Sequence, residues 1–209
     1  MIPVQIKAVQ YIANASTALL ANFGIPHHCR SLALLTTDSD DATYIALDEA
    51  TKTAQVEVGY ARSFYAGAAN ASTPYAGEVI GILAASTPGA VRSGMEAALA
   101  VLERIGFEET GGVPYLAHTV SSCGSFLARE AGVAIGTALA YLIAPPLESM
   151  VALDAALKAS DVQLQKLYPP PSETNFGGGL LTGSRSACAA ACDAFRRKVE
   201  EVAQRPIEQ

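Results

Sequence analysis

Three carboxylates and a hydroxyl stand together at positions 38–41, where the sequence reads Asp38, Ser39, Asp40, Asp41. Clustered carboxylates can bind a hard cation or act as general acid and base. The glycine and the distal glutamate of a calcium-binding loop are missing, so we expect no metal site here. Short polar side chains are also the preferred N-caps of helices. We therefore expect Asp38 or Ser39 to cap a helix that begins near Asp41.

No nucleophile in the sequence has the partners that covalent catalysis needs. The run CGS at 123–125 matches the start of a papain-like nucleophile motif, but no histidine follows His118 to serve as the downstream base. His27 and His28 stand beside a proline, where surface placement is the default, and no GxSxG motif occurs. The glycines within 177–183 lack the spacing of a dinucleotide-binding loop and the lysine of a phosphate loop. We expect no catalytic residue, and we expect that the protein is not an enzyme.

The four cysteines indicate packing more than chemistry. Cys29, Cys123, Cys188 and Cys192 form no CxxC pair of the kind that binds zinc. Cys188 and Cys192 lie one helical turn apart, which suits two thiols on the buried face of a helix. Disulfides are not expected in a cytosolic protein.

Composition narrows the class of partner. The net charge is -6 and no run of Lys or Arg occurs, so a nucleic-acid partner is not expected. The longest uncharged stretch, 131–147, is shorter than the roughly 20 residues that a membrane span needs. The N-terminus shows no secretory signal, and we expect a cytoplasmic protein without a membrane partner. Half of the residues are hydrophobic and only 16% are charged, an apolar excess that favours an oligomer.

An internal repeat is the strongest signal in the chain. The triplet AlaLeuAsp that ends at Asp48 recurs at Asp154, 106 positions later (154 − 48), and Lys52 recurs as Lys158 at the same offset. Each aspartate precedes its lysine by four residues, a spacing that predicts two exposed helical ion pairs. One duplication at so long a period indicates two similar domains, since solenoids repeat at shorter periods. We expect domains at 1–108 and 113–209, joined by a linker in the segment GFEETGGVP, 106–114.

Each half predicts the same succession of elements: a strand, a short helix near Leu19 or Leu127, a strand, a helix, a strand, a long loop, a strand and a final helix. Strands and helices are interleaved, so the fold class is α/β or α+β. The expected pairs of elements are strands 31–37 and 138–144, helices 42–52 and 148–158, strands 54–61 and 161–167, and strands 78–83 and 177–183.

The motifs now resemble a known family. ALDEATKTAQVEV and its echo ALDAALKASDVQL resemble tandem microcompartment shell domains. Longer runs, among them SDDATYIALDEATK, AYLIAPPLE, PPPSETN and LLTGSRSACAAACDAF, resemble the shell protein L family of ethanolamine-utilisation microcompartments, over about residues 3–207. The resemblance implies a circularly permuted shell fold in each half. It also implies a pseudo-hexameric trimer that tiles into a flat sheet with other shell proteins.

The resemblance also implies site residues. Small pores, one in each subunit, would be lined by Asp40, Glu78 and Phe107, with Thr174 and Asn175 nearby. A lysine of each central helix, Lys52 or Lys158, would lie at the edge where tiles meet.

The ligands and the compartment follow from the same resemblance. Ethanolamine is the expected transported ligand. No cofactor is required, although some relatives bind a corrinoid (cobalamin) at a central pore. Two alternatives stay open: a tile of a choline- or diol-degrading compartment, and a cytosolic small-molecule sensor.

Overall fold

The computed structural model describes residues 1–63, 79–170 and 176–207, which group into two compact units. The N-terminal unit comprises Pro3–Gly106 and Gly124–Leu127. The C-terminal unit comprises Met1–Ile2, Phe107–Cys123 and Ala128–Gln209. Four residues from the second half of the sequence thus belong to the N-terminal unit.

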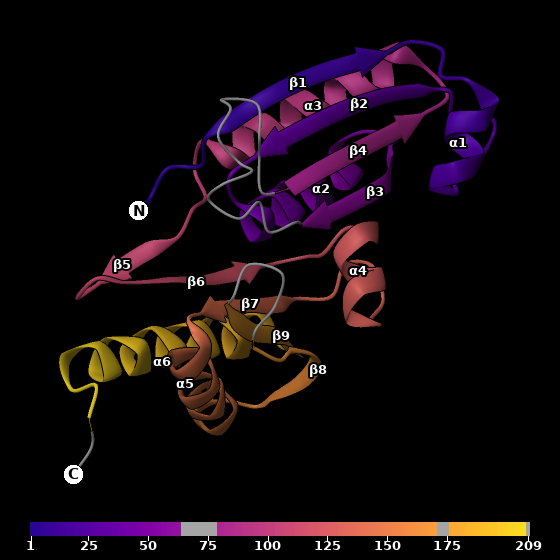
Figure 1. The fold of residues 1–209 in the computed structure, drawn as a ribbon. Helices are drawn as coiled ribbons and strands as arrows, with labels where there is room; N and C mark the ends of the chain where they lie inside the picture. Colours follow the sequence, from indigo (N-terminus) through magenta and orange to yellow (C-terminus); the bar gives the residue numbers. More distant parts are fainter. Residues whose placement is uncertain (64–78, 171–175, 208–209) are drawn as a thin grey trace. The chain divides into compact units, whose positions relative to one another are not determined.

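The N-terminal unit is an antiparallel sheet with two long helices packed on it (Figure 1). The strand order is β1-β2-β4-β3, and every neighbouring pair is antiparallel. Helices α2 and α3 contact each other and the sheet. The elements are β1 (Ile6–Ile12), α1 (Thr17–Phe23), β2 (Ser31–Thr37), α2 (Asp40–Thr53), β3 (Glu57–Ser63), β4 (Val79–Ala85) and α3 (Pro88–Leu102).

The C-terminal unit repeats this arrangement with one additional strand. Its order is β5-β6-β7-β9-β8, in which β6-β7-β9-β8 corresponds to β1-β2-β4-β3. Helices α5 and α6 pack on each other and contact the sheet, as α2 and α3 do. The elements are β5 (Glu108–Thr110), β6 (Val113–Val120), α4 (Ser125–Ala131), β7 (Leu139–Ala144), α5 (Pro146–Ala159), β8 (Val162–Tyr168), β9 (Gly177–Gly183) and α6 (Arg185–Gln204). The first three residues of α4 belong to the N-terminal unit. The mixed fold class predicted from the sequence is confirmed.

Apolar strands at the middle of each sheet form the cores. Every residue of β7 is buried, and β2 is buried at five of its seven positions. In the C-terminal unit, Phe195, Cys188 and Cys192 of α6 pack in the core beside this sheet. Both thiols are free, and burial raises the pKa of Cys192 to about 11. The prediction that these cysteines serve helix packing is confirmed.

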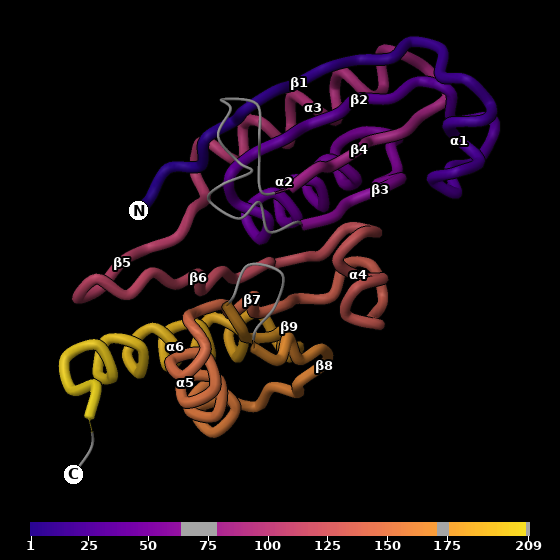
Figure 2. The backbone as a smooth tube through the Cα atoms, viewed as in Figure 1, coloured from indigo at the N-terminus to yellow at the C-terminus, as the bar shows by residue number. Residues whose placement is uncertain are grey.

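The expected linker is a β-hairpin. Thr110 of β5 pairs with Val113 of β6, and Gly111 and Gly112 form the two-residue turn between them (Figure 2). Both glycines have positive φ, 57° and 82°. A tight hairpin turn of this type needs positive φ at both central residues, which glycine adopts without strain. A segment rich in Gly, Pro and acidic residues has the composition of a linker, but here it forms the first hairpin of the C-terminal sheet.

The two short helices are built alike but begin differently. α1 and α4 each end at a glycine in the left-handed region, Gly24 with φ 68° and Gly132 with φ 67°. The hydroxyl of Ser16 accepts a hydrogen bond from Leu19 N at 3.3 Å and so caps α1. The corresponding position before α4 is Gly124, which has no side chain to do this. The start of α4 must obtain its acceptor from elsewhere.

Candidate functional site

The acidic run lies at the start of α2, but it does not cap the helix as expected. Ser39 occupies the N-cap position, yet its side chain makes no capping hydrogen bond. The Asp38 carboxylate instead accepts from Gln5 N at 2.8 Å, beside β1. Thr37 Oγ1 accepts from Ser39 N at 3.1 Å and shares a 2.7 Å hydrogen bond with Thr43. A threonine at the end of β2 therefore organises this turn, and the predicted side-chain capping is wrong.

Asp40 is the first residue of α2 and is 8% exposed. Its carboxylate accepts from Asp41 N at 2.8 Å. Burial raises the pKa of Asp40, and the hydrogen bond from the Asp41 backbone offsets part of that rise. The helix N-terminus also favours a negative charge at this position. Asp40 is therefore a partly desolvated carboxyl group, a condition under which a cation is attracted more strongly than in bulk water.

Phe107 lies at the start of the C-terminal unit. Its ring packs on Phe176, with centroids 5.7 Å apart. Phe176 follows directly after Thr174 and Asn175 in the sequence. Glu78, Thr174 and Asn175 lie outside the described residues. Of the expected pore residues, the structure thus describes Asp40 in one unit and Phe107 in the other.

The two lysines at equivalent positions have different partners. Lys158 pairs with Asp154 at 2.6 Å, one turn earlier on α5, and both side chains are mostly exposed. This is the pair that the sequence predicts. Lys52 pairs with Glu49 on α2, three residues earlier, and its side chain is 26% exposed. The expected exposed pair of Asp48 with Lys52 is wrong because Asp48 is buried and bonded elsewhere.

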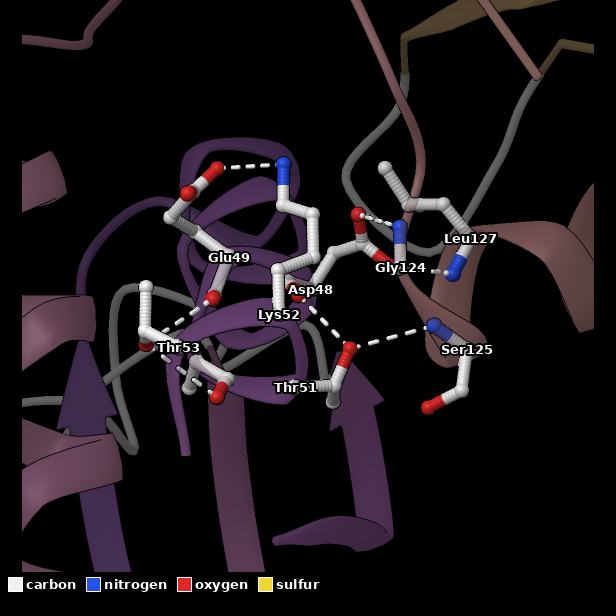
Figure 3. Close-up of polar contacts among 9 residues, drawn as sticks. Asp48, Glu49, Thr51, Lys52, Thr53, Gly124, Ser125 and Leu127 are labelled. Carbon is white, nitrogen blue, oxygen red and sulfur yellow. Dashed lines mark hydrogen bonds and ion pairs between the residues drawn. The ribbon is translucent and has the colours of Figure 1, made fainter. Parts of the chain in front are cut away.

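Asp48 is the principal site residue that sequence reasoning missed. It is 1% exposed, and its carboxylate accepts from Gly124 N at 2.7 Å and from Leu127 N at 2.8 Å (Figure 3). Thr51 Oγ1 accepts from Ser125 N at 3.1 Å. These acceptors supply the cap that Gly124 cannot provide for α4. Burial raises the pKa of Asp48, while the two backbone hydrogen bonds and nearby Lys52 favour its charged form.

Gly124 is required by this close approach. A Cβ atom there would lie 2.2 Å from Thr51 Oγ1 and 2.6 Å from the backbone oxygen of Asp48. Any other residue would push α4 away from α2. The glycine that was considered as part of a nucleophile motif is therefore a packing residue. In the sequence, the cue was the difference between Gly124 and its counterpart Ser16.

The described residues contain no group of three or more His, Cys, Asp or Glu side chains arranged to hold a metal ion. No helix of the described segments is long and apolar enough to cross a membrane.

Comparison with known proteins supplies the class. The family model described as the BMC domain matches residues 31–112. A bacterial microcompartment shell protein EutL of Clostridium perfringens is 54% identical over 97% of this chain and 95% of its own length. The crystal structure of the ethanolamine utilization protein EutL of Leptotrichia buccalis matches with a TM-score of 0.95 at 52% identity, covering 100% of this chain and 98% of that one.

A more distant structure shares the fold alone. The trimeric bacterial microcompartment shell protein PduB matches with a TM-score of 0.81 at 19% identity, over 96% of this chain and 89% of that one. The tandem sheets and these matches together define a bacterial microcompartment shell protein. The chain belongs to the EutL family of such proteins.

Proposed function

We propose that this protein is a structural tile in the shell of a microcompartment that degrades ethanolamine, and that it catalyses no reaction. The observation that carries the proposal is identity above 50% across nearly the whole chain to EutL shell proteins of two other bacteria. The sequence similarity to EutL proteins covers both units of the chain. It therefore supports a role for the whole two-unit protein and not for one domain alone. The alternative, a tile of a choline- or diol-degrading compartment, has no such support.

The assembled form that we propose is a homotrimer that joins other shell proteins in a flat layer. Each chain has two units with similar sheets, so three chains would supply six similar units around one axis and could close a ring. Lys158 is mostly exposed and Lys52 is partly exposed, so both remain accessible to a neighbouring tile. We assign these two lysines to the tile edge.

The transport role that we propose depends on small pores in each subunit. Asp40 and Glu78 would attract ethanolamine as its ammonium ion, and Phe107 would form an apolar or cation-π wall beside Thr174 and Asn175. The burial of Asp40 and the packing of Phe107 on Phe176 support this assignment. A volatile aldehyde carries no charge and gains no such attraction. A corrinoid at the central pore is a further proposed ligand, with no residues assigned to it.

Electron microscopy of the concentrated protein tests the tile. We expect flat arrays of trimers, alone or with other shell proteins. A closed oligomer that forms no arrays under any condition would favour the small-molecule sensor. Deletion of the gene in its host should leave ethanolamine-degrading enzymes active in extracts while aldehyde escapes from cells. Loss of enzyme activity in the extracts themselves would contradict a structural role.

A further inference from the structure

One buried hydroxyl holds the turn that carries Asp40. Thr37, the last residue of β2, is fully buried. Its Oγ1 donates to the carbonyl oxygen of Ser39 at 3.0 Å and accepts from the N–H of Ser39 at 3.1 Å. It also shares a 2.7 Å hydrogen bond with Thr43 Oγ1, in which Thr43 is the donor because the single hydroxyl proton of Thr37 goes to Ser39. One oxygen atom thus binds both backbone groups of the residue before Asp40.

The orientation of the Ser39 carbonyl matters for Asp40 because the two residues share a peptide plane. The same carbonyl oxygen accepts from the N–H of Thr43 at 3.2 Å, the first backbone hydrogen bond of α2. The side chain of Ser39 makes no capping hydrogen bond, although it occupies the N-cap position. Thr37 therefore fixes, from the strand, a peptide plane that an N-cap side chain does not fix here.

The second unit begins its central helix in another way. Thr37 and Ala144 are equivalent, since each pairs with the first residue of the next strand in its sheet. α2 begins two residues after the end of β2 is passed by Asp38 and Ser39, whereas only Pro145 separates β7 from α5. Both helices have 14 residues, and Pro146 stands where α2 has Asp40.

Proline explains why the second unit needs no hydroxyl from its strand. Its ring fixes φ near the helical value, so Pro146 is already arranged for the first position of a helix. Ser149, the counterpart of Thr43, is buried and donates to the carbonyl oxygen of Pro146 at 3.0 Å. The chain thus starts the same helix in two ways. Only the start that uses Thr37 leaves an ionisable side chain at the first position.

A buried aspartate depends strongly on its backbone for its position. The side chain is short, and the Asp40 carboxylate also accepts from the adjacent N–H of Asp41 at 2.8 Å. Asp40 is 8% exposed, so its carboxylate has little freedom to move toward a ligand. Binding groups have to be held within about 0.5 Å of their productive positions. A shift of the peptide plane before Asp40 would therefore displace the carboxylate from its site.

We propose that Thr37 is a positioning residue for the cation site, and that its hydroxyl holds the Asp40 carboxylate where it meets the ammonium group of ethanolamine. This inference rests on the pore role proposed for Asp40 and adds a buried residue that contacts no ligand. Without the hydroxyl, the N–H of Ser39 loses its acceptor, which is costly for a buried group. The turn then moves toward water and takes Asp40 with it, so the attraction of the carboxylate for a cation weakens.

Three variants test this role. Thr37→Val replaces the hydroxyl by a methyl group of similar shape, and Thr37→Ser keeps the hydroxyl. Thr36→Val is the matched control, because Thr36 is the preceding residue of β2 and its Oγ1 is buried without a hydrogen-bond partner among the described residues. Chemical denaturation checks that each variant is folded under the conditions of the two measurements.

The measurements are ethanolamine binding by calorimetry and the pKa of the Asp40 carboxyl by carbon-13 NMR in the ligand-free protein. We expect Thr37→Val to bind about fivefold more weakly or worse, the effect of losing one hydrogen bond. Thr37→Ser and Thr36→Val should stay within about twofold of the parent. Because burial raises the pKa of Asp40, this pKa should fall toward its ordinary value in Thr37→Val alone. A merely structural role of Thr37 would lower stability and leave both quantities unchanged in the folded protein.

The outcomes separate this inference from the proposed function. If the parent binds ethanolamine and Thr37→Val matches it in affinity and in the pKa of Asp40, the inference fails while the pore role stands. Equal losses in Thr37→Val and Thr36→Val would also overturn it. A parent that binds no ethanolamine contradicts the proposed function, and the pKa of Asp40 then decides the positioning role by itself. Should Thr37→Val not fold, Thr43→Val removes one of the three hydrogen bonds, and an unchanged pKa and affinity in that variant overturn the inference.

Discussion

The carboxylate of Asp48 accepts a hydrogen bond from the backbone N–H of Gly124, 2.7 Å away and 76 residues later in the chain. The repeat places Asp154 at the same position of the second central helix, where it instead pairs with Lys158 in solvent. One ancestral position thus has two uses. Its buried copy holds the start of α4 against α2, and its exposed copy pairs with a lysine on the surface of α5.

Replacing Asp48 with alanine should destabilise the fold. The change would leave the N–H groups of Gly124 and Leu127 without their buried acceptor. We expect a loss of about 2 to 4 kcal/mol in the free energy of unfolding, measured by chemical denaturation. Asp193→Ala is the matched control, because Asp193 forms an exposed helical pair with Arg196. Its loss should be about 0.5 kcal/mol or less. Equal losses in both variants would show that Asp48 does not hold α4.

A methyl group at position 124 should also be costly. In Gly124→Ala the new Cβ would meet Thr51 Oγ1 and the backbone of Asp48, so α4 must shift. We expect the free energy of unfolding to fall by about 1 to 3 kcal/mol. The control is Gly89→Ala in α3, where a Cβ would have no atom within 4 Å. That substitution should be neutral or stabilise by up to about 1 kcal/mol. A neutral Gly124→Ala variant would contradict the close approach.

Much of the fold could be predicted from the sequence, because the repeat tests each element twice. β2 and β9 begin and end where the apolar runs at 31–37 and 177–183 do. The central helices extend one to two residues beyond the predicted 42–52 and 148–158. Local periodicity is sufficient for elements of this length. It failed at the hairpin of β5 and β6, where two glycines have the composition of a linker.

The site was less predictable, because its main contact is not local. An aspartate four residues before a lysine has the spacing of a surface ion pair, and this is correct for Asp154. Nothing within α2 indicates that Asp48 is covered by residues from the other half of the chain. The membership of Gly124–Leu127 in the N-terminal unit is a tertiary fact. Only the change from Ser16 to Gly124 between the copies pointed to it.

The buried carboxyl of Asp40 should make stability depend on pH. Its pKa is raised above the ordinary 3.8, chiefly by burial, so between the unfolded and folded pKa values the native state binds more protons than the unfolded state. Stability from this group is therefore greatest below the unfolded pKa and falls as pH rises through the folded pKa. Asp40→Asn removes this dependence. The variant should gain stability relative to the parent as pH rises from about 3.5 to 7 in denaturation curves. If the stability of the variant instead falls relative to the parent over this range, the pKa of Asp40 is lowered in the folded state and the prediction is wrong.

The two edge lysines should affect assembly more than folding. Lys52→Ala and Lys158→Ala each remove a helical ion pair that is at least partly exposed, so the free energy of unfolding should change by about 0.5 kcal/mol or less. Flat arrays in electron microscopy should be lost or reduced while trimers persist. Lys198→Ala is the control, since Lys198 pairs with Glu201 three residues away, as Lys52 does with Glu49. If the double variant of Lys52 and Lys158 forms arrays like the parent, the edge role is wrong.

Ethanolamine should bind weakly, and binding should require the carboxylates of Asp40 and Glu78. Charge-assisted hydrogen bonds contribute about 1.5 to 3 kcal/mol each, so two of them less the cost of ordering correspond to a dissociation constant near millimolar, or about -4 kcal/mol. Calorimetry should show binding lost in Asp40→Asn and Glu78→Gln and kept in Asp193→Asn. Because only the ionised form of Asp40 attracts an ammonium ion, and burial raises the pKa of Asp40, affinity should increase as pH rises through that pKa. Equal affinity for an uncharged diol, or unchanged binding in both pore variants, would show that these carboxylates do not select the substrate.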